Sequence, residues 1–442
     1  MNILQLIRPA PFIPQIEGEE AIGKAYSYWR GRIFSGIYIG YVFFIFSRKS
    51  MIFAFPAIMT EMGFLKSQVG MLSSILSIMY GASKFLSGMV ADRSNPRFFM
   101  SLGLIFTALS TLLFSFSSSL IFLGLFCAIN GFFQGWGWPP CARQLTHWFS
   151  QKERGTWWGL WNTATTLGTA VIALLTVNLY TQFGWRAAVL VPSFLCIGAA
   201  FLVMKLLCDT PQSVGLPPIE VYKKEEPTRA KEQELGVKEI LFKYVLTNRY
   251  LWVLAFAYFC IYLIRAAITD WGMIYLIETK GYKAAVASAC IVSVEVGGFC
   301  GSIAAGWISD QIFKGKRGPV TILFSLGILI PLTYFWFSPA VPFPIEIGFF
   351  TLAGFLVYGP QMVIGMHAAE LAHKKASATA SGFTGTFAYA GAAVAGYPLG
   401  RLTEIFGWQA FFTALIIAAA AAVLLLSPLW SVQRREEPAI AS

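Results

Sequence analysis

Long apolar runs separated by short polar stretches make up most of the chain. Each run is long enough to cross a hydrocarbon layer as a helix, which takes roughly 20 apolar residues. The runs are continuous and contain glycine, proline and tryptophan, unlike the alternating strands of about 10 residues in a membrane barrel. We therefore predict an all-α membrane protein with twelve transmembrane helices, at residues 33–58, 67–91, 97–117, 121–144, 156–180, 185–207, 250–277, 287–312, 320–338, 344–371, 377–400 and 409–430.

A charged segment interrupts this series after the sixth span. It predicts a solvated cytoplasmic linker at residues 209–249, between a six-helix half at 1–208 and a second six-helix half at 250–442. Basic loops stay in the cytoplasm, so the side of the membrane with more lysine and arginine is expected inside. The loops on the linker's side carry ten such residues against five opposite, which places the linker and both termini in the cytoplasm. The ten are Arg93, Arg97, Arg143, Lys152, Arg154, Lys314, Lys316, Arg317, Lys374 and Lys375.

The composition supports a membrane protein and narrows its chemistry. Charged residues make up 12% of the chain and hydrophobic residues 56%, whereas soluble domains carry about 25% charge. The net charge of +11 is explained by basic cytoplasmic loops, so no nucleic-acid partner is expected. The seven cysteines show no C-x-x-C spacing and are interpreted as reduced packing residues. We expect no metal site and no cofactor.

Two arginines lie deep inside predicted spans. Arg48 stands about 15 residues into the first run, which is more than ~20 Å at 1.5 Å per residue and too far to reach back easily to water. Burying such a charge costs at least about 2.5 kcal/mol, and it persists where it faces a cavity or a partner. Arg265 lies at a similar depth in the seventh span, and its distance from Arg48 along the sequence is close to half the chain length. We interpret the two arginines as a pair, one from each half of a duplicated protein.

Sequence motifs recur at nearly the same separation as the two arginines. Gly88 to Asp92 after the second span matches Gly306 to Asp310 after the eighth. Phe183-Gly184-Trp185 before the sixth span recurs as Phe406-Gly407-Trp408 before the twelfth, again about half a chain length later. Repeats with an even number of spans keep the same topology, so the halves are predicted to be parallel repeats about an axis along the membrane normal.

With six plus six helices, a charged linker and a Gly-x-x-x-Asp turn in each half, the chain resembles the major facilitator superfamily. Within it, the chain is similar to the organophosphate:phosphate antiporters, on four motifs: Tyr80 to Phe85, Asp92 to Arg97, Gln134 to Cys141 and His147 to Gly155. Two more motifs are most similar to the bacterial hexose-6-phosphate transporter and sensor branch: Arg265 to Gly272 and Ala388 to Ala392. The likeness covers essentially every span and fails only in the linker and the tails.

The charges within the spans favour an anionic ligand. Those away from the span ends sum to +2, from Arg48, Lys49, Lys84 and Arg265 against Asp270 and Glu295. A buried surplus of positive charge is unfavourable unless an anion neutralises it, and a phosphate monoester carries about −1.5 to −2. Each guanidinium can make two parallel hydrogen bonds to phosphate oxygens. The resemblance likewise implies that Arg48 and Arg265 bind the substrate's phosphate. The alternative is that both are structural cations paired with Asp270 and Glu295.

Further side chains are candidates for the same site. The family motif carries Lys84, which is either another phosphate ligand or a helix residue reaching toward water. Tyr41 and Tyr262 lie at helical spacing before the two arginines and either donate hydroxyls or pack. In the fifth span Thr165 stands where the resembled family has a histidine, so this position cannot carry a proton near pH 7. The remaining substrate-site candidates are Tyr389 and His367, the latter being either a sugar contact or a packed polar residue.

Lys49, Asp270 and Glu295 suggest a gate. Lys49 points about 100° away from Arg48 around its helix, and Asp270 is five residues beyond Arg265. We interpret the three as gating salt bridges between spans one, seven and eight that compete with the ligand for the cationic centre. A static buried pair is the alternative.

These observations predict a function. We expect a monomeric antiporter in the bacterial inner (plasma) membrane that exchanges a sugar phosphate, glucose 6-phosphate, for inorganic phosphate by alternating access. Membrane lipid is its other partner. A proton-coupled organophosphate symporter, for example of glycerol 3-phosphate, and a membrane hexose-phosphate sensor are the alternatives. The sequence shows no nucleophile beside a base, so an enzyme is not expected.

Overall fold

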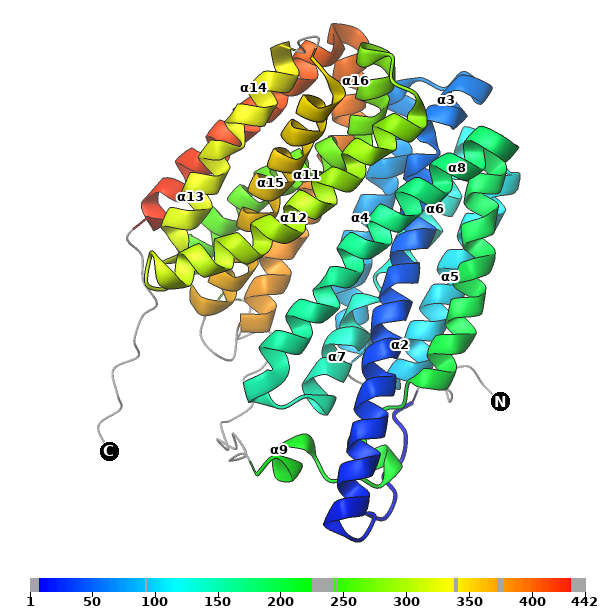
Figure 1. The fold of residues 1–442 in the computed structure, drawn as a ribbon, viewed down its shortest axis with the longest axis vertical. Coiled ribbons are helices and arrows are strands. Elements are labelled where there is room, and N and C mark those ends of the chain that lie inside the picture. Colours follow the sequence, from blue (N-terminus) through cyan, green and yellow to red (C-terminus); the bar gives the residue numbers. More distant parts are fainter. Residues whose placement is uncertain are drawn as a thin grey trace. The chain divides into compact units, whose positions relative to one another are not determined.

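The computed structural model describes residues 8–91, 94–224, 242, 245–337, 341–371 and 377–430. Their regular secondary structure is helical (Figure 1). Nine helical stretches in these ranges are long and apolar enough to cross a membrane, and three of them consist of two consecutive helices in the description below. Two of the nine, α8 (Gln151–Leu206) and α16 (Ser377–Leu426), each contain two helices joined at a non-helical glycine. The all-helical membrane fold is therefore confirmed, while the number of twelve spans stays a prediction.

The N-terminal part of the chain forms helices that follow the predicted spans with three differences. The first helix begins earlier than predicted, at Glu19, and a break at Ala54 precedes a second helix with Pro56 in its first turn. The fourth span is divided at residues 135–137. The elements are α2 (Glu19–Phe53), α3 (Phe55–Met62), α4 (Lys66–Ala91), α5 (Pro96–Phe116), α6 (Leu120–Gln134), α7 (Trp138–Trp148), α8, η1 (Pro211–Val214) and α9 (Ile219–Tyr222).

The C-terminal part begins at Asn248, whose side chain caps the first helix by accepting from the Tyr250 amide at 3.1 Å. The ninth predicted span is divided at Ile328 into two helices. The elements are α11 (Arg249–Lys280), α12 (Ala284–Gln311), α13 (Arg317–Gly327), α14 (Leu329–Phe337), α15 (Phe343–Leu371), α16 and η4 (Ser427–Leu429).

The chain divides into two compact units. The first takes its described residues from Met1–Gly63 and Ile78–Glu232, and the second from Phe64–Ser77 and Gln233–Ser442. In the first unit α2 and α5 both pack against α8, and in the second α11 packs against α16 and α12 against α15. The first half of α4 thus belongs to the second unit, which the sequence did not lead us to expect. The predicted domain boundaries at 208 and 249 stay a prediction.

The repeat detected in the sequence has a backbone counterpart. Gly184 and Gly407, the central residues of the two Phe-Gly-Trp motifs, have φ of +83° and +78° with extended ψ, a conformation that is essentially restricted to glycine. Gly63 and Gly281, which are separated along the chain by the same interval as Asp92 and Asp310, end α3 and α11 in the left-handed conformation. Both halves therefore change direction at matching glycines.

The start of the predicted linker is folded rather than solvated. Asp209 accepts a hydrogen bond from Arg143 at 2.8 Å, and its backbone oxygen accepts from the Trp148 indole at 3.1 Å. Tyr26 donates to the backbone oxygen of Pro217 at 2.5 Å. Burial of Asp209, Leu216 and Ile219 accompanies these contacts. Residues 225–241, 243 and 244 of the predicted linker lie outside the described residues, as do Asp92, Arg93, Lys374 and Lys375.

Candidate functional site

Arg48 lies on α2 in the first unit against an aromatic ring. Its guanidinium carbon is 5.3 Å from the ring centre of Tyr80 on α4. The Nε of Arg48 is buried and makes no hydrogen bond within the described part of the chain. A guanidinium stacked on an aromatic face keeps its in-plane N–H groups available for a planar or tetrahedral anion. The sequence singled out Arg48 but not Tyr80 as its neighbour.

A buried polar network fixes α2 beside Arg48. The Gln134 amide nitrogen donates to the Ser47 hydroxyl and to the Phe44 backbone oxygen, each at 2.9 Å. Thr111 donates to the Ser47 backbone oxygen at 3.2 Å, and Asn130 donates to Thr111 at 2.9 Å. Polar side chains that satisfy one another between apolar helices rigidify the packing. Polar residues scattered singly among apolar ones are the sequence signal for such a network.

Lys84 is positioned by the break between α6 and α7. Ser87 on α4 donates to the Gly135 backbone oxygen at 2.6 Å, and a Cβ atom at Gly135 would collide with the Ser83 hydroxyl. The glycine lets α4 approach the break, where α7 starts with Trp138. The Lys84 ammonium then lies 4.8 Å from the Trp138 ring centre, a cation–π distance. Trp138, which belongs to the Gln134 to Cys141 motif of the family resemblance, thus lies beside Lys84.

Of the other first-unit candidates, Tyr41 and Lys49 lie on α2 and Thr165 lies on α8. Tyr41 is buried, with its ring centre 4.7 Å from that of Trp161 on α8. Thr165 is half-buried one helical turn beyond Trp161. The ammonium of Lys49 lies 5.8 Å from the ring centre of Phe53. These placements leave their predicted roles untested.

Arg265 occupies the corresponding position in the second unit and has a different environment. Its Nη2 donates to the Tyr358 hydroxyl at 3.0 Å, and this hydroxyl donates to Glu295 at 2.7 Å. The guanidinium carbon is 4.5 Å from the Tyr358 ring centre and 5.4 Å from that of Tyr262. Glu295 is 1% exposed. A buried carboxylate linked through a phenol therefore balances the charge of Arg265. The sequence did not single out Tyr358.

Further tyrosines extend this cluster. The ring centres of Tyr262 and Tyr389 are 5.7 Å apart, and those of Tyr258 and Tyr262 are 5.0 Å apart. Rings at these separations pack favourably, and each brings a phenol hydroxyl into the second unit's cluster. The structure thus groups the predicted residues Tyr262 and Tyr389 with Arg265.

The two predicted acids have separate surroundings. Asp270 accepts a hydrogen bond from the Ser73 hydroxyl at 3.3 Å and one from Thr269 at 3.1 Å, whereas Glu295 is bound to Tyr358. The Tyr358 hydroxyl links Glu295 to Arg265, and the gating role of both acids stays a prediction. The pairing of Lys49 with either acid stays a prediction.

His367 is buried on α15, nine residues beyond Tyr358 and three before Glu370. At 1.5 Å per residue it lies about 13 Å along the helix from Tyr358, so it is not part of the Arg265 cluster. The sequence also missed Glu346, which is fully buried, accepts from the Tyr334 hydroxyl at 2.7 Å and lies 3.9 Å from the Lys280 ammonium. Glu346 and Lys280 carry opposite charges, so together they do not change the surplus of positive charge within the membrane.

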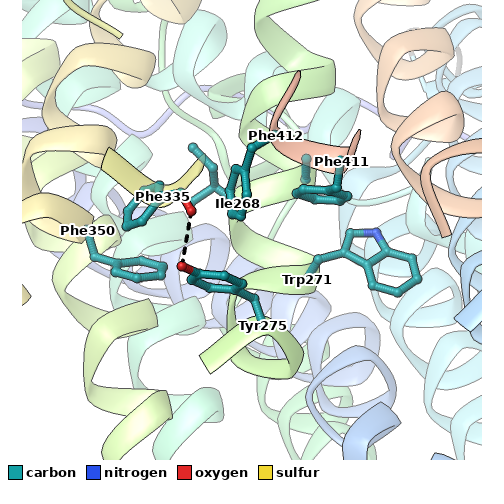
Figure 2. A pocket seen from close by; sticks show the side chains of 9 residues that line it. Ile268, Trp271, Tyr275, Phe335, Phe350, Phe411 and Phe412 are labelled. Atoms are coloured by element: carbon teal, nitrogen blue, oxygen red, sulfur yellow. Dashed lines mark hydrogen bonds between the residues drawn. The ribbon is translucent and has the colours of Figure 1, made fainter. Parts of the chain in front are cut away.

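A small apolar cavity lies elsewhere in the second unit (Figure 2). Its volume is about 10 Å³, and aromatic rings from α11, α14, α15 and α16 surround it, with Tyr275 donating to the Phe335 backbone oxygen at 3.2 Å. The cavity is too small for a substrate. Among the described residues no group of three or more His, Cys, Asp or Glu side chains is arranged to hold a metal.

Comparison with known proteins defines the class of this chain. Residues 37–396 match the model of the Major Facilitator Superfamily. A solved bacterial homolog of the human lysosomal transporter Spinster, in an inward-facing and unoccupied conformation, superimposes with a TM-score of 0.70. That comparison covers 91% of this chain and 96% of the other at 15% identity, so it bears on the fold alone. The chain is a multi-pass membrane protein of this transporter superfamily, not an enzyme.

Three relatives of similar length refine this classification. A probable hexose phosphate transport protein of Chlamydia pneumoniae is 48% identical over 98% of this chain and 99% of its own. The membrane sensor protein UhpC of Escherichia coli (strain K12) is 42% identical over 98% and 100%. The glycerol-3-phosphate transporter of Bacillus subtilis (strain 168) is 40% identical over 98% and 100%. This chain belongs to the Major Facilitator Superfamily and, within it, to the organophosphate:phosphate antiporter family, as the sequence motifs predicted.

Proposed function

We propose that this transporter exchanges a sugar phosphate, glucose 6-phosphate, for inorganic phosphate across the bacterial inner membrane by alternating access. Arg48 and Arg265 bind the phosphate group in both substrates. One observation carries the proposal: two intramembrane arginines at matching repeat positions each lie against a tyrosine ring. Stacking orients each guanidinium while leaving N–H groups for the anion. The protein acts as a monomer with both termini in the cytoplasm.

The relatives support this substrate class. Two of the relatives named above are a probable hexose phosphate transport protein and a glycerol-3-phosphate transporter. Both compounds share a phosphate monoester, which carries about −1.5 to −2 charges near neutral pH. The shared group is what the two arginines would recognise, with Lys84 as a further phosphate ligand. The part of the substrate that differs would be read by neighbouring side chains such as Tyr41 and Tyr389.

Exchange follows from the charge balance. An empty centre with a surplus of positive charge resists reorientation, because an excess of cations is costly in a medium of low dielectric constant. Bound phosphate neutralises the surplus and lowers the cost of moving between the two states. Since inorganic phosphate and the sugar phosphate both do this, the cycle completes only when one anion follows the other.

Phosphate-loaded proteoliposomes containing the purified chain test this proposal. Labelled glucose 6-phosphate should accumulate without a pH gradient, and unlabelled glycerol 3-phosphate should compete more weakly than unlabelled glucose 6-phosphate. Liposomes loaded with a non-phosphate buffer should show no accumulation. Uptake that needs an imposed proton gradient and ignores internal phosphate would instead support a symporter.

A sensor is the second candidate, because a membrane sensor protein is 42% identical over nearly the whole chain. The same preparation separates the two. Glucose 6-phosphate binding, measured by calorimetry, together with absent counterflow would favour a sensor. Binding with counterflow supports the transporter.

A further inference from the structure

The first half of α4 meets α16 through backbone contacts within the second unit. A Cβ atom placed on Gly70 would lie 2.6 Å from the Gly396 backbone oxygen, and one on Gly400 would lie 2.7 Å from that of Lys66. Small residues at four-residue spacing let two membrane helices approach this closely. Here the spacing occurs twice, as Gly70 and Ser74 on α4 and as Gly396 and Gly400 on α16.

We call this contact between the first half of α4 and α16 the seam. One α4 side chain in the seam takes part in the backbone hydrogen bonding of α16. The buried Ser74 hydroxyl donates to the Ala393 backbone oxygen at 2.5 Å and accepts from the Tyr397 backbone amide at 2.7 Å. Residues 393 and 397 are four apart, and in a regular helix these two groups bond to each other. The Ser74 hydroxyl of α4 therefore replaces the hydrogen bond that the Ala393 oxygen and the Tyr397 amide of α16 would otherwise form with each other.

The next positions of α16 weaken the same stretch of the ladder. Pro398 has no amide hydrogen, so it cannot donate to the Val394 oxygen four residues earlier. The Ala395 oxygen accepts from the Trp271 indole of α11 at 2.7 Å. Three successive carbonyls of α16 are thus affected. Those of residues 393 and 395 accept hydrogen bonds from outside α16, and that of residue 394 lacks its usual helical donor. This is where a helix bends or straightens at least cost.

We propose that Ser74 is a positioning residue for transport, which latches residues 393–398 of α16 in a hydroxyl-bridged form. When the first half of α4 withdraws, Ala393 and Tyr397 bond to each other and this stretch of α16 straightens. The latch rests on the chain being a transporter and is independent of which substrate it carries. Serine suits this role because one hydroxyl both donates and accepts.

The seam has a reporter position that leaves the latch intact. Ser67 is 7% exposed in the first turn of α4, and its backbone amide donates to Glu404 on α16 at 3.2 Å. A cysteine at residue 67 retains this amide and becomes reactive only when the seam opens. Cys300 is the exposed native cysteine, so Cys300→Ser gives a suitable background.

The test is the rate of N-ethylmaleimide labelling of Ser67→Cys in proteoliposomes, which needs no substrate. We expect Ser74→Ala to raise the rate about five- to tenfold, as the loss of one or two buried hydrogen bonds implies. Pro398→Ala, which restores an amide to the ladder, should change it in the same direction. Ser288→Ala is the matched control, since its buried hydroxyl bonds within its own helix, to Ala285 at 2.8 Å.

Hydrogen exchange of the Tyr397 amide distinguishes a latch from a merely structural bond. In Ser74→Ala the amide should stay protected within about a factor of three, because the Ala393 oxygen replaces the hydroxyl. Strongly faster exchange would mean that the ladder cannot close, and would overturn the proposal. Labelling rates in Ser74→Ala and Pro398→Ala that both equal the Ser288→Ala rate would overturn it as well.

Discussion

Arg48 and Arg265 occupy matching positions in the two repeats, yet their units balance charge differently. The Arg265 guanidinium reaches Glu295 through the Tyr358 hydroxyl, so its unit supplies a counter-charge. Arg48 stacks on Tyr80, and its buried Nε has no hydrogen-bond acceptor among the residues that the structure describes. Duplication thus preserved the two cations while their partners diverged. Under the proposed function, an external anion would therefore change the energy of Arg48 more than that of Arg265.

The surplus of intramembrane charge is also uneven. The candidates in the first unit are three cations, Arg48, Lys49 and Lys84, whereas the second unit has Arg265 with two acids. Under the proposed function, a phosphate dianion would therefore be attracted mainly by the first unit. The second unit would supply a pre-oriented guanidinium whose carboxylate competes with the ligand.

Replacing Arg48 by glutamine should have the largest effect. Loss of a charge-assisted bidentate contact costs about 3 kcal/mol or more, so glucose 6-phosphate exchange should fall at least about 100-fold. Initial counterflow rates in phosphate-loaded proteoliposomes measure this. Arg186→Gln is the control, because Arg186 is exposed and pairs with Glu61. Exchange that survives in Arg48→Gln would remove Arg48 from the site.

Replacing Gly184 or Gly407 by alanine should destabilise the protein to a similar extent. Gly184 and Gly407 adopt positive φ with extended ψ, so a Cβ atom costs about 1–3 kcal/mol through backbone strain alone. Thermal unfolding in detergent compares Gly184→Ala, Gly407→Ala and the control Gly198→Ala, where a Cβ atom meets nothing within 4 Å. A loss at one kink only would show that the repeats are not equivalent there.

Removing the Tyr358 hydroxyl should have a smaller, specific effect. Tyr358→Phe keeps the ring beneath Arg265 but breaks its link to Glu295, which should lower exchange about three- to tenfold. The matched control is Tyr334→Phe, which breaks a phenol–carboxylate bond to Glu346 in another part of the unit. Equal losses in the two variants would argue that Tyr358 acts through stability, which thermal unfolding of both would reveal.

A histidine at residue 165 should produce the smallest change and a distinct pH profile. An imidazole near its usual pKa of about 6.5 gains a proton as the pH falls, and the added positive charge favours an anion. The KM for glucose 6-phosphate in Thr165→His, divided by that of the wild type, should therefore fall about two- to fivefold between pH 7.5 and pH 5.5. Thr163→His, two residues away on the helix, is the control. A flat ratio would place residue 165 outside the anion's reach.

The sequence was sufficient for the fold class and for singling out two arginines deep inside the apolar runs. Continuous apolar runs identified the helices, since only a fully hydrogen-bonded backbone is stable in hydrocarbon. The depth of Arg48 and Arg265 singled them out because an intramembrane charge is costly. The repeat was visible because duplication leaves motifs at a fixed distance.

Partners of these residues were not predictable, because periodicity says which face of a helix is apolar but not which side chains of other helices meet it. Three contacts are of this kind: Tyr80 beside Arg48, Tyr358 between Arg265 and Glu295, and the Ser74 hydroxyl among the backbone hydrogen bonds of α16. Tyr80 and Ser74 lie in apolar stretches where the sequence pattern favours packing. Their chemistry arises from contacts between segments that lie far apart along the chain.

The sequence by itself determined that this protein is a duplicated helical membrane transporter with an arginine deep in each half, because the cost of polar groups in hydrocarbon leaves a pattern along the chain. Only the tertiary structure decided how each arginine is stacked and balanced, and which helix the first half of α4 joins. Those outcomes depend on side-chain geometry between distant segments, which no local pattern records.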